Sequence, residues 1–168
     1  MTRGKIRVMA PQTPYSADLG DRDPIEAMRD SLERFRSLAH WSNDEFERSY
    51  APGKWSAREV LVHLAQSELA FGARARLALT TANYESQAFD QNRWMDRESR
   101  LGAREALDAL LAVGAMNIAL FASLPLADRA MTFAHPEYGA ISIDWLIHQM
   151  AGHQIHHLRQ LEIGRAHV

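Results

Sequence analysis

Apolar residues recur every three or four positions in four stretches of the chain, and charged or polar residues fill the positions between them. This spacing is typical of amphipathic helices, because about 3.6 residues make one helical turn. The stretches cover residues 25–38, 57–80, 101–123 and 143–161. We therefore predict four helices.

The segments between these stretches contain residues that start or stop helices. Ser56 and Glu59 form the S-x-x-E pattern of a capping box at the start of the second helix. Pro125 follows the end of the third helix, and Ser142 is placed to cap the fourth. Residues 132–141 favour a short extended pair. Because little else alternates like a strand, the pattern indicates an all-α fold, an up-and-down four-helix bundle whose core is suited to a metal site.

The chain divides into three parts by composition. Residues 1–24 are rich in Pro, Thr, Ser and Asp and are expected to form an irregular leader. Residues 25–161 contain all four predicted helices and form one domain. Residues 162–168, EIGRAHV, resemble the translation of a sequencing adapter, so we expect the natural chain to continue differently after Leu161 and we assign this tail no functional role.

Charge and composition exclude several classes of function. The 168 residues include 19 Lys and Arg against 21 Asp and Glu, a formal charge of -2, which disfavours nucleic acid as a partner. The chain has no cysteine, so any metal must be held by nitrogen or oxygen. No apolar run approaches the ~20 residues that cross a bilayer, so no membrane partner is expected. We expect a cytoplasmic protein.

Histidines on two helices are the main candidates for chemistry. His153 and His157 are four residues apart, so both leave the same face of the last helix, at the edge of its apolar stripe. His148 and His156 fall on the outward, solvated side of that helix. His63 lies in the second helix. One histidine on an apolar face is more often a core residue than a ligand, but the three together favour a metal site.

Three imidazoles and an open position are the pattern of catalytic rather than closed structural zinc sites. Zinc and nickel both suit such ligands. Gln149 and Gln160 lie beside His153 on the helical wheel and are expected to orient an imidazole or a bound water. Glu68 lies near the apolar side of the second helix and is expected to pair with an arginine rather than with the metal.

Three segments together resemble the DinB-like, or DinB/YfiT, superfamily: PGKWSAREVLVHL at 52–64, FDQNRW at 89–94 and HQIHHLRQL at 153–161. The resemblance covers residues 25–161. It implies a four-helix bundle of up-down-down-up order, commonly dimeric, with the polar segment 81–100 as a long crossover between helices two and three. It also implies a metal held by three histidines, which fall on His63, His153 and His157.

The resemblance also limits the functional hypothesis. Similar proteins include transferases and isomerases that use small thiols such as bacillithiol or mycothiol, and proteins known only as metal-dependent hydrolases. We expect an enzyme for a small-molecule substrate, whose divalent metal activates either a low-molecular-weight thiol, which the resemblance slightly favours, or water. The alternative is a noncatalytic metal-binding or interaction module. The sequence assigns no catalytic residue beyond the ligands.

A second apolar face on the second helix suggests a homodimer. Val62 and Leu69 lie roughly opposite the main apolar side of that helix. Such a face needs cover. A second subunit or the leader is expected to provide it.

Overall fold

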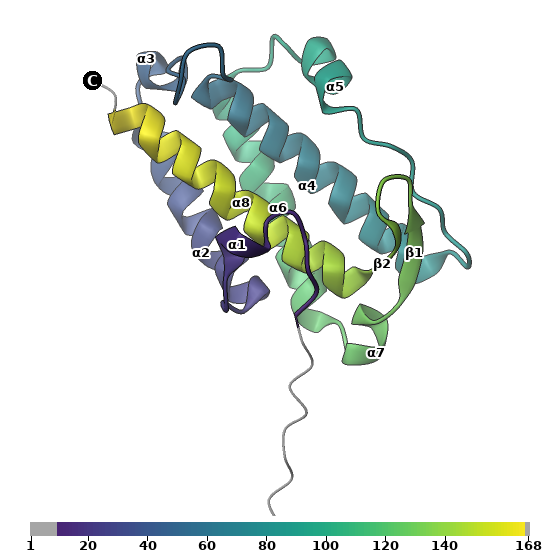
Figure 1. Ribbon diagram of the computed structural model, residues 1–168. Coiled ribbons are helices and arrows are strands. Elements are labelled where there is room, and N and C mark those ends of the chain that lie inside the picture. The colour runs from purple at the N-terminus through teal and green to yellow at the C-terminus, as the bar shows by residue number, and fades with distance from the viewer. Residues whose placement is uncertain (1–9, 167–168) are drawn as a thin grey trace, which may run out of the picture.

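The computed structural model describes residues 10–166, which form a bundle of four long helices (Figure 1). These helices are α2 (Pro24–Ser37), α4 (Ala57–Thr80), α6 (Ala103–Ser123) and α8 (Ile143–Ala166). They confirm the four helices predicted from the apolar spacing, and α8 runs beyond the predicted end at Leu161. The core between them is built from large apolar side chains of all four helices, including Met28, Phe35, Leu61, Leu64, Leu110, Phe121, Leu146 and Ile147.

Short elements precede α2 or connect the long helices. They are α1 (Ser16–Leu19), the 3-10 helix η1 (Leu38–His40), α3 (Asn43–Phe46), α5 (Gln91–Arg97), α7 (Leu126–Arg129), β1 (Thr132–His135) and β2 (Gly139–Ser142). β1 and β2 pair antiparallel with Phe133 opposite Ile141, and both side chains are buried. This hairpin confirms the extended pair expected at 132–141.

Side-chain caps set where α4 and α8 begin. Ser56 Oγ accepts a hydrogen bond from the Glu59 backbone N–H at 3.3 Å, and Glu59 Oε2 accepts one from the Ser56 N–H at 2.8 Å, which completes the predicted capping box. Ser142 Oγ accepts a bond of 3.0 Å from the Trp145 N–H. Both start signals are therefore confirmed.

The helix directions are up, down, down, up. Arg58 and Arg76, near the two ends of α4, contact Ser99 before α6 and Asn117 towards its end, so α4 and α6 run parallel. Arg104 at the start of α6 donates to the carbonyl of Ala39 beyond the end of α2, so these two helices are antiparallel. His63, near the start of α4, contacts His153 in the middle of α8, and Arg74, near the end of α4, lines the same pocket as Trp145 at the start of α8. These two helices are therefore antiparallel. The up-and-down order expected from the connections is wrong, and the order implied by the resemblance is confirmed.

The physical reason is the length of the segment between α4 and α6. Residues 81–102 join the far end of α4 to the start of α6. Twenty-four helical residues span about 36 Å, and an extended chain of 22 residues reaches about 70 Å. The segment is therefore long enough to return along the whole bundle, as Figure 1 shows.

The length and hydropathy of α6 also differ from what the sequence analysis led us to expect. Its 21 residues, with a mean hydropathy of 1.7 over the best window, are long and apolar enough to cross a membrane by length and composition, contrary to the expectation that no such run exists. In the structure α6 packs against α2 and α4, with Leu107, Leu110 and Phe121 buried. A helix that packs in the core of a helical bundle can have the same length and composition.

The second face expected on α4 is partly covered within the chain. Val62 is fully buried, whereas half of the Leu69 side-chain surface is exposed. Val62 is therefore not available to a second subunit, because neighbouring segments of the bundle already cover it. A homodimer stays a prediction.

The described part of the leader lies across α8. α1 packs on α8, and the Trp145 Nε1–H donates a hydrogen bond of 2.8 Å to the carbonyl of Gln12. His148 lines a hollow under this segment with only 12% of its side chain exposed, and His156 lies near Asp18 with 38% exposed. The expectation of a solvated face is wrong for His148, because the leader covers it, whereas His156 stays partly exposed.

Candidate metal centre

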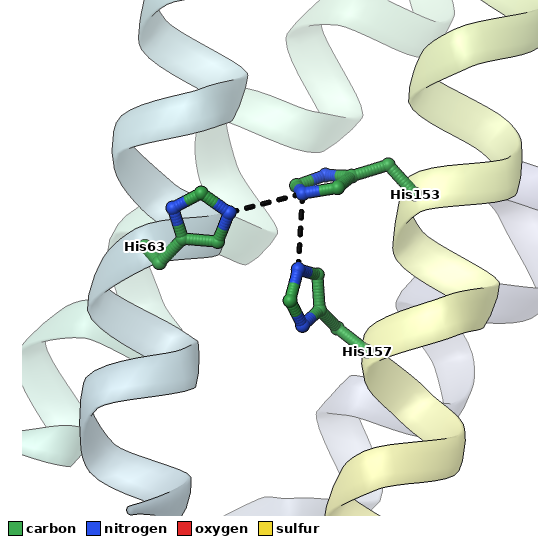
Figure 2. Close-up of side chains that lie close together, drawn as sticks. All are labelled: His63, His153 and His157. Atoms are coloured by element: carbon green, nitrogen blue, oxygen red, sulfur yellow. Dashed lines mark hydrogen bonds between the residues drawn. The ribbon is translucent and has the colours of Figure 1, made fainter. Parts of the chain in front are cut away.

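Three histidine side chains from two helices meet between α4 and α8. Figure 2 shows His63 of α4 pointing toward His153 and His157 of α8. The Nε2 atom of His153 lies 3.0 Å from the Nε2 atoms of both His63 and His157. All three residues are buried. The structure thus brings together the three histidines selected from the sequence.

The helix pairing explains this convergence. His153 and His157 are one turn apart, so their side chains leave the same side of α8. α4 runs antiparallel beside them and places His63 opposite. The ring of His63 lies against Trp55, at 5.0 Å between centroids, and stacks parallel to Phe89 at 6.4 Å. These aromatic rings restrict how the imidazole can turn.

Burial keeps the three imidazoles neutral. Desolvation lowers the pKa of His63 to about 4. Burial, with a smaller contribution from the neighbouring His63, lowers the pKa of His157 to about 3. Burial and both neighbouring histidines hold the pKa of His153 well below 6.5. Near neutral pH each ring therefore has one lone pair available.

The contacts of His153 Nε2 fit a cation better than hydrogen bonds. A ring nitrogen either carries a proton or has a lone pair, so this atom cannot donate to one neighbour and accept from the other. A metal at the centre would accept a lone pair from all three rings at once. Nitrogens bound tetrahedrally at about 2.0 to 2.1 Å from zinc lie about 3.3 Å apart, close to the 3.0 Å observed.

The two glutamines expected near the histidines differ in their contacts. The Nδ1–H of His157 donates a hydrogen bond of 2.7 Å to Gln160 Oε1. Gln149 makes no hydrogen bond to any of the three histidines in the described chain and instead lines a neighbouring pocket. Helical side chains lean toward the N-terminus, so Gln160 reaches back toward His157 while Gln149 leans away from His153.

Glu68 has a different environment from the one expected. Its carboxylate is buried and accepts hydrogen bonds from the amides of Asn117, at 2.8 Å, and Gln154, at 2.6 Å. No ion pair to Glu68 is present among residues 10–166, so the expected arginine partner is wrong. Burial raises the pKa of this carboxyl group. Amide donors replace the arginine because Asn117 and Gln154 face α4 from α6 and α8.

A pocket of about 340 Å³ opens beside the histidines. His63 and His153 form part of its wall, and residues of α4, α8, the crossover, the hairpin and the leader complete it. Its volume is in the range of small-molecule sites. The sequence did not indicate Tyr15, Arg74 and His135 as parts of this wall, because they come from distant segments that share no local pattern.

Comparison with known proteins assigns the family. The family model described as the DinB superfamily matches residues 25–161. The chain belongs to the DinB superfamily. Among curated relatives, an Oceanobacillus iheyensis protein named "Putative metal-dependent hydrolase" is 32% identical over 121 residues, covering 71% of this chain and 70% of that protein. A Bacillus cereus protein with the same name is 28% identical over 126 residues, covering 74% and 73%.

Two solved structures share the fold of this chain. YfiT from Bacillus subtilis, described as a probable metal-dependent hydrolase with an unusual four-helix bundle topology, aligns with a TM-score of 0.77 at 20% identity, covering 96% of this chain and 93% of YfiT. A mycothiol-dependent maleylpyruvate isomerase aligns with a TM-score of 0.68 at 16% identity. The alignment covers 89% of this chain and 63% of the isomerase. The four-helix bundle is therefore a shared architecture.

Proposed function

We propose that His63, His153 and His157 bind one divalent metal ion and that this DinB superfamily member is a metal-dependent enzyme for a small molecule. The observation that carries the proposal is the meeting of three buried, neutral imidazoles, two of which, His63 and His153, form part of the wall of a pocket. Three protein ligands leave a coordination position for a reactant, as in catalytic metal sites. Zinc and nickel both suit these ligands.

A divalent ion held there would act as a Lewis acid and lower the pKa of a bound water or thiol. The residues of the chain position the ligands. Gln160 keeps the proton of His157 on Nδ1, which leaves the Nε2 lone pair free. Trp55 and Phe89 lie against the buried ring of His63 and restrict its orientation.

Hydrolysis is the reaction that the names of the relatives support. The oxygen of water would bond to the carbonyl carbon of an ester or amide, the bond to the leaving group would break, and the proton of water would pass to that group. Thiol transfer is the second candidate, supported by the mycothiol-dependent isomerase that shares the fold. There the thiol sulfur would bond to an electrophilic carbon, and the thiol proton would leave with the displaced group.

The first experiment measures metal content. Protein purified without a polyhistidine tag is analysed for metals, together with His63→Ala, His153→Ala, His157→Ala and His40→Ala. His40 is exposed and belongs neither to the three-histidine cluster nor to the wall of the pocket, which makes it the matched control. We expect about one metal ion per chain in the wild type and in His40→Ala, and a large loss in the other three. Equal metal content in all five proteins would refute the site.

The second experiment separates an enzyme from a structural metal module. Chelator-treated protein is assayed before and after zinc or nickel is restored, with chromogenic esters and with a small thiol plus a chromogenic electrophile. Turnover that depends on the metal, in a protein that stays folded without it, supports the enzyme. Metal-dependent folding without turnover of either substrate class supports the noncatalytic module.

A further inference from the structure

Arg74 is a buried cation in the wall of the pocket. It lies on α4 eleven residues after His63, and His63, Ser67, Phe71 and Arg74 all line the same cavity. Only 6% of the Arg74 surface is exposed. Eleven residues of helix span about 16 Å, so the guanidinium group lies along the pocket from the histidines rather than beside them.

The charge of Arg74 has no anionic partner in residues 10–166. One amino group donates a hydrogen bond of 2.6 Å to the carbonyl of Gln87, and the other lies 3.2 Å from Nε2 of His135. No carboxylate oxygen of the described residues lies within ion-pair distance of Arg74, although Glu137 also lines the pocket. Buried charges in proteins are normally paired, and a guanidinium has five N–H donors to satisfy.

His135 adds a second donor beside Arg74. It lies on β1, in the hairpin next to the C-terminal part of α4 (Figure 1). Its Nδ1 accepts a hydrogen bond of 3.2 Å from the Glu137 backbone N–H. Burial and the charge of Arg74 lower the pKa of His135, so the ring is neutral near pH 7. A neutral imidazole accepts one hydrogen bond, and two donors compete for it.

His135 cannot accept hydrogen bonds from both Glu137 and Arg74, so at least one N–H group is left without an acceptor. When Nδ1 accepts from Glu137, the ring proton is on Nε2 and faces the N–H of Arg74. Two donors that face each other are satisfied by an acceptor that both can reach. A carboxylate suits this role because its two oxygens accept several hydrogen bonds and pair with the planar guanidinium.

A further unpaired polar atom lies in the same pocket. Gln149 is 7% exposed, lines the cavity, and its Oε1 has no hydrogen-bond partner within residues 10–166. Asp90 is also in the wall, but its carboxylate caps α5 by accepting a bond of 3.1 Å from the Arg93 N–H. Besides Arg74 and His135, the wall of the pocket thus contains one further buried polar atom without a partner, Oε1 of Gln149.

We propose that Arg74 and His135 bind a carboxylate group of the substrate, so that the substrate class is small carboxylic acids with a reactive group separated from the carboxylate by several atoms. The assignment of the reactive end to the three histidines rests on the proposed function. The carboxylate site itself rests on the contacts of Arg74 and His135.

The test compares ligands that differ only in the charged end. Binding of hexanoate and hexanol is measured by titration calorimetry to metal-loaded and to chelator-treated protein, in the wild type, Arg74→Gln and Arg76→Gln. Arg76 is the matched control, because it is on the same helix and bonds to Gly72 and Asn117 outside the pocket. A hydrogen-bonded charge pair is worth about a ten- to hundredfold change in affinity.

We expect hexanoate to bind about tenfold or more tightly than hexanol to the wild type and to Arg76→Gln, and nearly equal affinities in Arg74→Gln. A merely structural Arg74 would weaken both ligands alike, and equal affinities in the wild type would overturn the carboxylate site without any variant. Arg74→Lys, which keeps the charge, should retain part of the preference. If Arg74→Gln does not fold, the comparison in wild type and Arg74→Lys decides.

Mercaptoalkanoates from the propionate to the octanoate, with the matching mercaptoalkanols, then probe both ends of the pocket in cobalt-loaded protein. A thiolate absorption band that is strongest for one chain length of the acid supports both proposals. A carboxylate preference without any cobalt–thiolate band supports the Arg74 site and contradicts thiol binding at the metal. A band of equal strength for acids and alcohols supports the metal site and contradicts the Arg74 site.

Discussion

His157 donates a hydrogen bond of 2.7 Å from Nδ1 to Oε1 of Gln160, three residues later on α8. This contact fixes the tautomer in which Nε2 of His157 faces the other two histidines with a free lone pair. We predict that Gln160→Leu weakens metal binding about ten- to a hundredfold. Competition with a coloured chelator measures the change.

Gln149→Leu is the matched control for metal binding, because Gln149 lies on the same helix but contacts none of the three histidines. It should leave the affinity for metal within about twofold. Equal losses in both variants would show that the Gln160 contact does not orient His157.

The metal-free protein should lose stability as the pH falls below 6.5. The pKa of His63 is about 4 in the folded state and about 6.5 in an unfolded chain. Between these values the unfolded state binds the proton and the folded state does not, so the free energy of unfolding decreases with falling pH. His63 alone contributes about 3 kcal/mol of loss by pH 4.

Two other groups affect how the free energy of unfolding depends on pH. His157, with a pKa of about 3, extends the loss below pH 4. Glu68 acts in the opposite direction, because its raised pKa gives stability at low pH that is lost as the pH rises. Urea unfolding of chelator-treated wild type and His63→Gln at several pH values checks this. The variant should show a shallower acid slope, and identical slopes would contradict the prediction.

Gly152 permits the leader to lie against α8. A Cβ at this position would lie 2.5 Å from the carbonyl oxygen of Tyr15, whose ring contacts His153 at 5.1 Å. We predict that Gly152→Ala lowers the free energy of unfolding by about 1–3 kcal/mol and increases proteolysis within residues 10–23. Thermal unfolding and limited proteolysis measure both effects.

Gly114→Ala is the control for Gly152→Ala. A Cβ there would meet only the end of the Leu32 side chain, at 2.9 Å, which can move. We expect a smaller loss of stability and an unchanged pattern of proteolysis in the leader. Release of the leader by both variants would contradict a specific role for Gly152.

Substitutions of Glu68 test how much its hydrogen bonds in the core contribute to stability. Glu68→Leu removes the acceptor of the Gln154 amide and of one Asn117 N–H, while the Asn117 amide keeps its bond to the backbone carbonyl of Glu68. The loss should cost about 2 kcal/mol or more. Glu68→Gln should change stability by less than about 1 kcal/mol, because the unpaired Oε1 of Gln154 can turn to accept from the new amide. Chemical unfolding at neutral pH compares the two variants, and a greater loss in Glu68→Gln would contradict this account.

Local patterns in the sequence determined the four helices, their starts and the pairing of His153 with His157, whereas the resemblance to a known family joined His63 to them. Helical periodicity and the caps at Ser56 and Ser142 depend on residues three or four positions apart, so they can be recognised without the fold. The same spacing placed His153 and His157 on one side of α8. Helical spacing placed both Gln149 and Gln160 beside His153, and it could not show that only Gln160 bonds to a histidine.

The tertiary structure alone decided the rest. The order of the helix directions depends on which helix faces pack against one another and on the path of residues 81–102. Local spacing of residues encodes neither. The leader covers His148 although this residue lies on the outward side of α8. Arg74 and His135 are 61 residues apart and become neighbours only when the hairpin packs beside α4. Periodicity specifies the inward side of a helix, whereas contacts between distant segments depend on the packing of the whole chain.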